Sequence, residues 1–182
     1  MWRRFCGALL AVMAAWFLAS CNTTRKAAAP APESEQAISE ALKGLYMAAS
    51  AAAPQSPEQQ KVILRMAEKA SNGKELLLVM RAADGVFPSD AGSQAEHLER
   101  QVRSLVTAKM MQVGTLEQMV EYATGHAVDP ENARALVQRM FELGNENSDP
   151  RAWYRIRGAA FHLKVSDLER QAQARAEKLA GR

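Results

Sequence analysis

Apolar residues recur along most of this chain at the spacing of a helix. Ile38, Leu42, Leu45 and Ala49 fall at i, i+4, i+7 and i+11, which is one stripe of a helix that we expect over 35–53. The alternation of apolar and polar residues that marks a half-buried strand is almost absent. The pattern therefore predicts an all-α domain.

Polar residues that favour helix ends separate the apolar stripes. Residues 56–59, Ser-Pro-Glu-Gln, are typical of a helix start, and Asn-Gly at 72–73 is expected to end that helix. The apolar run at 76–80 has no second strand candidate to pair with, so we expect a buried helix over 74–83. The two Gly and one Pro of 84–92 predict a loop.

Five further helix starts are predicted in the second half of the chain. They are marked by capping pairs or by Asp-Pro and lie at Ser93/Glu96, Thr115/Gln118, Asp129-Pro130, Asp149-Pro150 and Ser166/Glu169. The links between helices are short, which favours antiparallel neighbours. We therefore predict a single all-helical domain over 35–182, with about eight short helices stacked as antiparallel helical hairpins, either solenoid-like or as a compact bundle.

Two of these starts are 34 residues apart, which makes 115–180 resemble tetratricopeptide-like helical hairpins. Trp153 and Ile156 match the pattern of that family. Its later small and aromatic positions fall on Glu169 and Gln173, and the first hairpin has no Trp. The resemblance implies stacked helical hairpins.

The first residues have the layout of a secretory signal peptide. A positive head with Arg3 and Arg4 precedes an uncharged run over 5–17, and small residues follow. The run is short for a membrane-spanning helix, which needs roughly 20 apolar residues. We expect residues 1–20 to be a signal peptide of the general secretory route, because the surroundings of the Arg pair match the twin-arginine motif poorly.

Leu18-Ala19-Ser20-Cys21 resembles the lipobox of bacterial lipoproteins, which is an aliphatic residue, two small residues and Cys. The resemblance implies that the thiol of Cys21 receives a diacylglycerol, that the chain is cut after Ser20, and that the new amine is also acylated. One acyl chain holds a protein on a membrane weakly, whereas two or three hold it effectively permanently. The alternative is an uncleaved apolar anchor with an accidental Cys.

Residues 21–34 are expected to be the lipidated Cys and a disordered tether, because they hold no aliphatic residue larger than Ala and include Pro30 and Pro32. An Asp after the lipidated Cys resembles an inner-membrane retention signal in enteric bacteria. Asn22 stands at that position and favours the outer membrane, facing the periplasm. Cys6 lies in the signal peptide, so we expect no intrachain disulfide after cleavage.

The formal charge of the chain is +3, and two of the positive charges lie in the signal peptide. A nearly neutral mature chain disfavours a nucleic-acid binder. The charge is uneven, since residues 151–182 hold eight Lys and Arg against three Asp and Glu. This basic end is interpreted as a solvated helix face or as a contact for anionic headgroups or an acidic partner.

The sequence contains no motif that carries a known chemistry. His97, His126 and His162 are far apart, and no phosphate loop, dinucleotide motif or nucleophile elbow occurs. Glu117 and Glu121 share one helix face, where such a pair is usually solvated surface. We expect no catalytic residue, no metal and no cofactor apart from the covalent lipid.

Trp153 and Tyr154 lie among Arg151, Arg155 and Arg157, and aromatic residues among Arg are typical of protein interfaces. The candidates for binding a partner are Trp153, Tyr154, Arg155 and Arg157. The simpler interpretation places Trp153 and Phe161 in the core and the Arg residues on the outer face.

Three functions fit these features. The favoured one is a non-enzymatic protein-binding scaffold or assembly factor at the outer membrane, because anchor, tether and helical hairpins resemble pilotins at the level of class. One alternative is a periplasmic enzyme that acts on the cell wall through a site assembled across helices. The other is a carrier of a small apolar ligand or lipid in a cavity among Met and Leu side chains.

Overall fold

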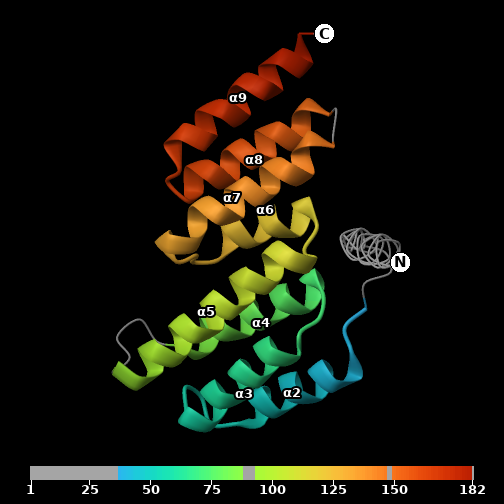
Figure 1. Ribbon diagram of the computed structural model, residues 1–182. Coiled ribbons are helices and arrows are strands. Elements are labelled where there is room, and N and C mark those ends of the chain that lie inside the picture. Colours follow the sequence, from blue (N-terminus) through green and yellow to red (C-terminus); the bar gives the residue numbers. More distant parts are fainter. Residues whose placement is uncertain (1–36, 88–92, 147–148, 182) are drawn as a thin grey trace, which may run out of the picture.

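The computed structural model describes residues 37–87, 93–146 and 149–181. Within these ranges the chain forms eight α-helices and no strand, which confirms the predicted all-α class. The predicted signal peptide, Cys21, the predicted tether and the side chain of Ser93 lie outside the described residues. Figure 1 labels the helices α2 (Glu40–Ala51), α3 (Pro57–Lys69), α4 (Gly73–Val86), α5 (Ser93–Val113), α6 (Leu116–Gly125), α7 (Pro130–Asn145), α8 (Pro150–His162) and α9 (Ser166–Ala180).

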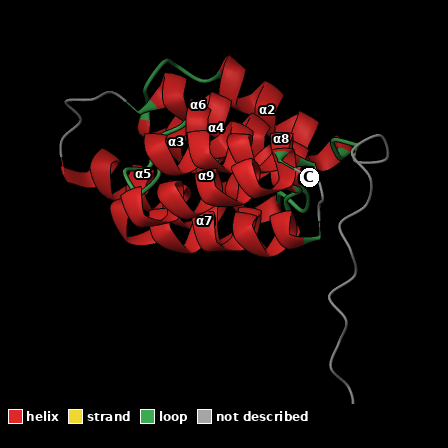
Figure 2. Ribbon diagram, turned by 90° about the horizontal axis from the view of Figure 1, so that it is seen from above, coloured by secondary structure: helices red, strands yellow, loops and turns green. Residues whose placement is uncertain are grey.

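The helices stack in chain order as a solenoid. Every extensive contact between described helices joins elements that are one or two apart along the chain; α7, for example, packs against α8 and α9. In Figure 2, α2, α4, α6 and α8 lie along one side of the molecule and α5, α7 and α9 along the other. Figure 1 shows the stack running from α2 at the bottom to α9 at the top. Contact restricted to neighbouring units is the property that separates a solenoid from a bundle.

Short polar side chains cap five of the eight described helices. Ser39, Ser56, Asn72 and Thr115 each accept a hydrogen bond from the backbone N–H of the third helical residue, and Asp149 accepts one from the second residue of α8. Thr115 and Gln118 form the complete capping box that the sequence predicted. Proline is the first residue of α3, α7 and α8. The backbone N–H at that position has no acceptor within the helix, so proline, which lacks the N–H, costs no hydrogen bond there.

The predicted helix end at Asn72-Gly73 is wrong. Asn72 has an extended backbone and caps α4, whose first residue is Gly73. A Cβ on Gly73 would lie 1.9 Å from Oε1 of Gln118, so a larger residue here would have to displace the Gln118 side chain, which closes the capping box of α6. The Asn-Gly pair therefore begins α4 and does not end α3. Its glycine allows close packing and is not needed for a left-handed turn.

Other predicted boundaries also need correction. α2 is shorter than the helix expected over 35–53, because Ser39 caps it. α4 runs to Val86, into the loop expected at 84–92. Ser166 is helical, so it is not the cap of α9, whose preceding residue makes no side-chain cap.

One apolar core runs through the stack. It consists mainly of Leu, Ile, Val, Met and Ala. Unbranched thioether side chains fill irregular gaps well, and the methionines that are fully buried here are Met66, Met80, Met110, Met119 and Met140.

Cations cover the C-terminal ends of three helices, each from the helix two further along the chain. Nζ of Lys109 in α5 donates to three carbonyl oxygens at the end of α3, at 2.9, 2.6 and 3.0 Å. Nε of Arg139 in α7 donates to the carbonyl of Met111 in α5 at 3.1 Å. Arg175 in α9 donates to the side chain of Asn145 at the end of α7. Helix C-termini carry unpaired carbonyls and partial negative charge, so these contacts stabilise the stacking.

A buried carboxylate joins the first helices of the stack. Glu75 in α4 is 0% exposed; its Oε1 accepts the Ser39 N–H at 2.7 Å, and its Oε2 accepts the N–H and Oγ of Ser71 at 2.7 and 2.9 Å. Burial raises the pKa of Glu75, but the hydrogen bonds from Ser39 and Ser71 outweigh burial and hold that pKa below its ordinary 4.5. The ionised carboxylate therefore fixes the start of α2 to the link between α3 and α4.

Candidate functional site

The candidate residues from the sequence do not form one surface. Cys21 and Ser20 lie outside the described residues. Trp153 is 2% exposed and packs edge-on against Phe141, with ring centroids 5.1 Å apart. The guanidinium of Arg175 covers the Trp153 ring, 4.7 Å from its centroid. Trp153 is therefore a core residue that holds α7, α8 and α9 together.

The other three candidates lie on different sides of α8. Nη1 of Arg155 bonds to Oε1 of Glu117 in α6 at 3.0 Å, and both side chains are exposed. Nη1 of Arg157 donates to Oε1 of Gln173 in α9 at 2.7 Å. Tyr154 is 43% exposed. The two Arg side chains thus contact neighbouring helices, and the tyrosine is open to solvent.

Phe161 is 66% exposed, so the prediction that it belongs to the core is wrong. It follows Trp153 by eight residues, a spacing that separates two side chains by about 80° around a helix. It follows Tyr154 by seven residues, a spacing that places both on one stripe. The spacing in the sequence therefore already groups Phe161 with Tyr154 and not with Trp153.

A glycine separates the two exposed rings. A Cβ built on Gly158 would meet no atom within 4 Å, so the surface above it is empty. Arg151 and His162 are exposed on the same side of the helix. We call the surface formed by Arg151, Tyr154, Gly158, Phe161 and His162 the open face of α8.

Hollows lie at both ends of this face. A pocket of about 390 Å³ lies at the starts of α6 and α8, and Arg151 and Glu117 line it. A groove of about 870 Å³ lies at the other end, between the α6–α7 and α8–α9 links. Its titratable lining residues are His126, Arg134, His162, Lys164 and Asp167.

Two of the charged groups in the groove neutralise each other. Nη2 of Arg134 donates to both carboxylate oxygens of Asp167 at 2.8 and 2.9 Å, and this hydrogen bond lowers the pKa of the Asp167 carboxyl. Lys164 forms no ion pair with a described residue and has a left-handed backbone, with φ of 57°. Its N–H donates to the Phe161 carbonyl, and the Val165 N–H donates to the Ala160 carbonyl. This is the Schellman ending of a helix, with lysine where glycine is usual.

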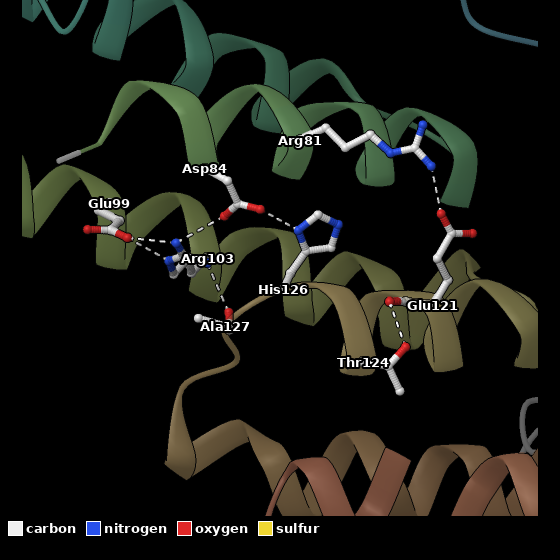
Figure 3. A network of polar contacts seen from close by, with 8 residues as sticks. All are labelled: Arg81, Asp84, Glu99, Arg103, Glu121, Thr124, His126 and Ala127. Carbon is white, nitrogen blue, oxygen red and sulfur yellow. Dashed lines mark hydrogen bonds and ion pairs between the residues drawn. The ribbon is translucent and has the colours of Figure 1, made fainter. Parts of the chain in front are cut away.

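A polar network fixes one wall of the groove, and Figure 3 shows its members reaching toward one another from three segments. Nδ1 of His126 lies 2.6 Å from Oδ2 of Asp84 in α4. Arg103 in α5 contacts Asp84 at 3.2 Å and Glu99 at 2.7 Å, and it donates to the carbonyl of Ala127 at 3.1 Å. The network therefore ties α4 and α5 to the α6–α7 link.

The pair Glu117 and Glu121 is exposed, as expected, and each carboxylate contacts an arginine. Oε1 of Glu121 lies 2.7 Å from Nη2 of Arg81 in α4, which Figure 3 also shows. Exposed ion pairs of this kind contribute about 0–1 kcal/mol each. These two ion pairs link α4 to α6 and α6 to α8.

Among the described residues, no three His, Cys, Asp or Glu side chains are grouped so that they could hold a metal ion. None of the described helices combines the length and the apolar character needed to cross a bilayer. Comparison of the chain with protein-family models, with curated proteins and with solved structures gives no match.

Proposed function

We propose that this chain is a bacterial lipoprotein, held on the outer membrane through Cys21, whose helical stack binds another envelope protein and assists its assembly, as pilotins do. The anchor rests on Leu18-Ala19-Ser20-Cys21 and the apolar segment before it. The observation that carries the binding role is the open face of α8, where Phe161 and Tyr154 stand exposed on one stripe.

Exposed aromatic side chains that are grouped on one stripe indicate an interaction site more than scattered ones do. Phe, Tyr and Arg are enriched in the centres of protein interfaces. In the open face they lie between two hollows, which offer recesses for side chains of a partner. Solenoids commonly use an extended surface of this kind for binding.

The proposed anchor keeps this surface near the lipid. An extended chain reaches about 3.3 Å per residue, so residues 22–39 keep the start of α2 within about 60 Å of Cys21. A partner that inserts into the same membrane is then confined to a thin layer with the solenoid, which raises its effective concentration.

The anchor is tested by growth with radiolabelled palmitate. Wild type is expected to incorporate label and to fractionate with membranes, because the thiol of Cys21 is the acceptor. Cys21→Ser is expected to lose both properties. Equal labelling of the two proteins would refute the lipoprotein assignment.

The binding role is tested by crosslinking in intact cells. A photoreactive phenylalanine analogue replaces Phe161 in one strain and Ala174, an exposed residue of α9, in the control strain. Position 161 is expected to give an adduct with an envelope protein, and position 174 is not. Absence of any adduct from position 161 and from Tyr154 would contradict a partner on this face.

A further inference from the structure

We infer that the open face of α8 binds a short acidic segment of a partner protein, with one apolar side chain of that segment packed over Gly158 between Tyr154 and Phe161. The inference rests on the proposed function and specifies the chemistry of the partner.

The charge of α8 points to an acidic ligand. The helix holds three Arg and one His and has no Asp or Glu. Arg155 and Arg157 have partners on neighbouring helices, but Arg151 forms no ion pair with a described residue. Lys164, just beyond the other end of the helix, forms none either. A cation that forms no ion pair with a described residue therefore stands at each end of the open face.

The carboxylates near this face are already engaged. Glu117 contacts Arg155 at 3.0 Å. Asp149 caps α8 and accepts the backbone N–H of Arg151 at 2.9 Å. In the groove, Asp167 is bonded by Arg134. Carboxylates of a ligand would thus meet Arg151 and Lys164 without displacing an internal ion pair.

The middle of the face has the shape of an apolar notch. Tyr154, Gly158 and Phe161 fall at i, i+4 and i+7, so a bare Cα lies between two rings. A glycine inside a helix is less stable than an alanine. Nothing in the described structure requires it, because a Cβ there would meet no atom within 4 Å. A side chain from outside can occupy this space.

The length of the face limits the ligand. A rise of 1.5 Å per residue places Arg151 and His162 about 17 Å apart along α8. That distance corresponds to three helical turns or about five extended residues. The hollows at both ends accept the flanking carboxylates, so the ligand is a single segment rather than a broad protein surface.

A segment of a protein fits this face better than an anionic bilayer. Glu117 and Glu121 are 58% and 49% exposed on α6, which packs against α8. Each of these carboxylates is paired with an arginine, so α6 offers an anionic bilayer no free cation. Arg151 and Lys164 alone would have to hold the bilayer, and two basic residues attract such a surface weakly. A single acidic chain lying along α8 can contact both cations and the two rings between them.

The test uses the full lipidated chain in detergent and a displayed library of random peptides of about 12 residues, a length chosen to span three helical turns. The expected result is enrichment of peptides with at least two Asp or Glu around a Leu, Ile or Phe. A synthetic copy of the most enriched peptide and a copy with Lys in place of each acid are then compared. The acidic copy is expected to bind at least about tenfold more tightly.

Variants then locate the site. Phe161→Ala, Gly158→Leu and Arg151→Glu are each expected to weaken the acidic peptide by about tenfold or more, because they remove a ring, fill the notch or reverse the charge. Tyr46→Ala and Lys178→Glu are the matched controls on α2 and α9 and are expected to bind normally. Thermal melts of all variants check that binding is lost from folded protein.

Three outcomes would overturn the inference. They are enrichment of peptides without acidic bias or of none, binding that the α8 variants leave unchanged, and binding of the protein to phosphatidylglycerol vesicles through Phe161 with no peptide binding. The proposed function fails separately, because it requires an adduct at position 161 or at position 154 in cells whatever the charge of the captured segment.

Discussion

Replacing Glu75 by Gln tests how a buried charge holds the first helices together. The side chain of Glu75 is fully buried and accepts three hydrogen bonds, one from Ser39 and two from Ser71. Glutamine keeps one acceptor oxygen and presents an NH₂ group to the other donors. At least one backbone N–H is then buried against a donor.

The cost follows from these contacts. A hydrogen bond to a charged group contributes about 1.5–3 kcal/mol, and a buried donor without a partner costs about 1–3 kcal/mol. We expect Glu75→Gln to destabilise the protein by about 2–4 kcal/mol at pH 7. With a urea dependence of about 1–3 kcal/mol per molar, the unfolding midpoint should fall by about 1–2 M. Glu68→Gln, an exposed carboxylate on α3, is the control and should leave the midpoint unchanged.

The pH dependence gives the sharper test. The native pKa of Glu75 lies below the ordinary 4.5 of an unfolded chain, because the hydrogen bonds from Ser39 and Ser71 outweigh burial. The unfolded state therefore binds the proton first, and stability from this group falls as the pH drops. The difference in unfolding midpoint between wild type and Glu75→Gln should be largest at neutral pH. It should decrease from pH 4.5 downward and vanish below the native pKa of Glu75. Equal midpoints at pH 7, or a gap that stays constant down to pH 3, would refute the reasoning.

Three further predictions test the stacking and the groove. Lys109→Met should destabilise the protein by about 1–3 kcal/mol, because three carbonyls at the end of α3 lose a charged donor; an unchanged urea midpoint would contradict this. Burial raises the pKa of Tyr122 to about 12 despite its hydrogen bond to Thr107, so an absorbance titration should show one tyrosine ionising near pH 12. The free energy of unfolding should fall as the pH rises above 10, because the unfolded chain loses that proton first. If no tyrosine ionises above the ordinary range, the packing around this ring is not as described. Lys164→Gly should raise the thermal midpoint, with a gain of about 1 kcal/mol, because glycine adopts the left-handed backbone without strain; a lower midpoint would show that the lysine side chain supports the fold.

The candidate surface was only partly accessible from the sequence. Helical spacing places Tyr154 and Phe161 on one stripe and Trp153 on another, so the stripes themselves could be predicted. Which stripe faces the core depends on the helices that pack there, and both stripes carry aromatic residues. The ion pair of Arg155 and the left-handed backbone of Lys164 arise from neighbours that no local pattern reveals.

The sequence by itself determined the helical class, most helix starts and the apolar stripes from which most of the core is drawn. These features depend on spacing and capping within a few residues, and such interactions act before any tertiary contact exists. Only the tertiary structure decided that the helices form a solenoid, that Gly73 opens a helix against Gln118, and that Phe161 stays exposed. Each of these depends on which surfaces meet across the stack, and residues far apart in the chain set that outcome.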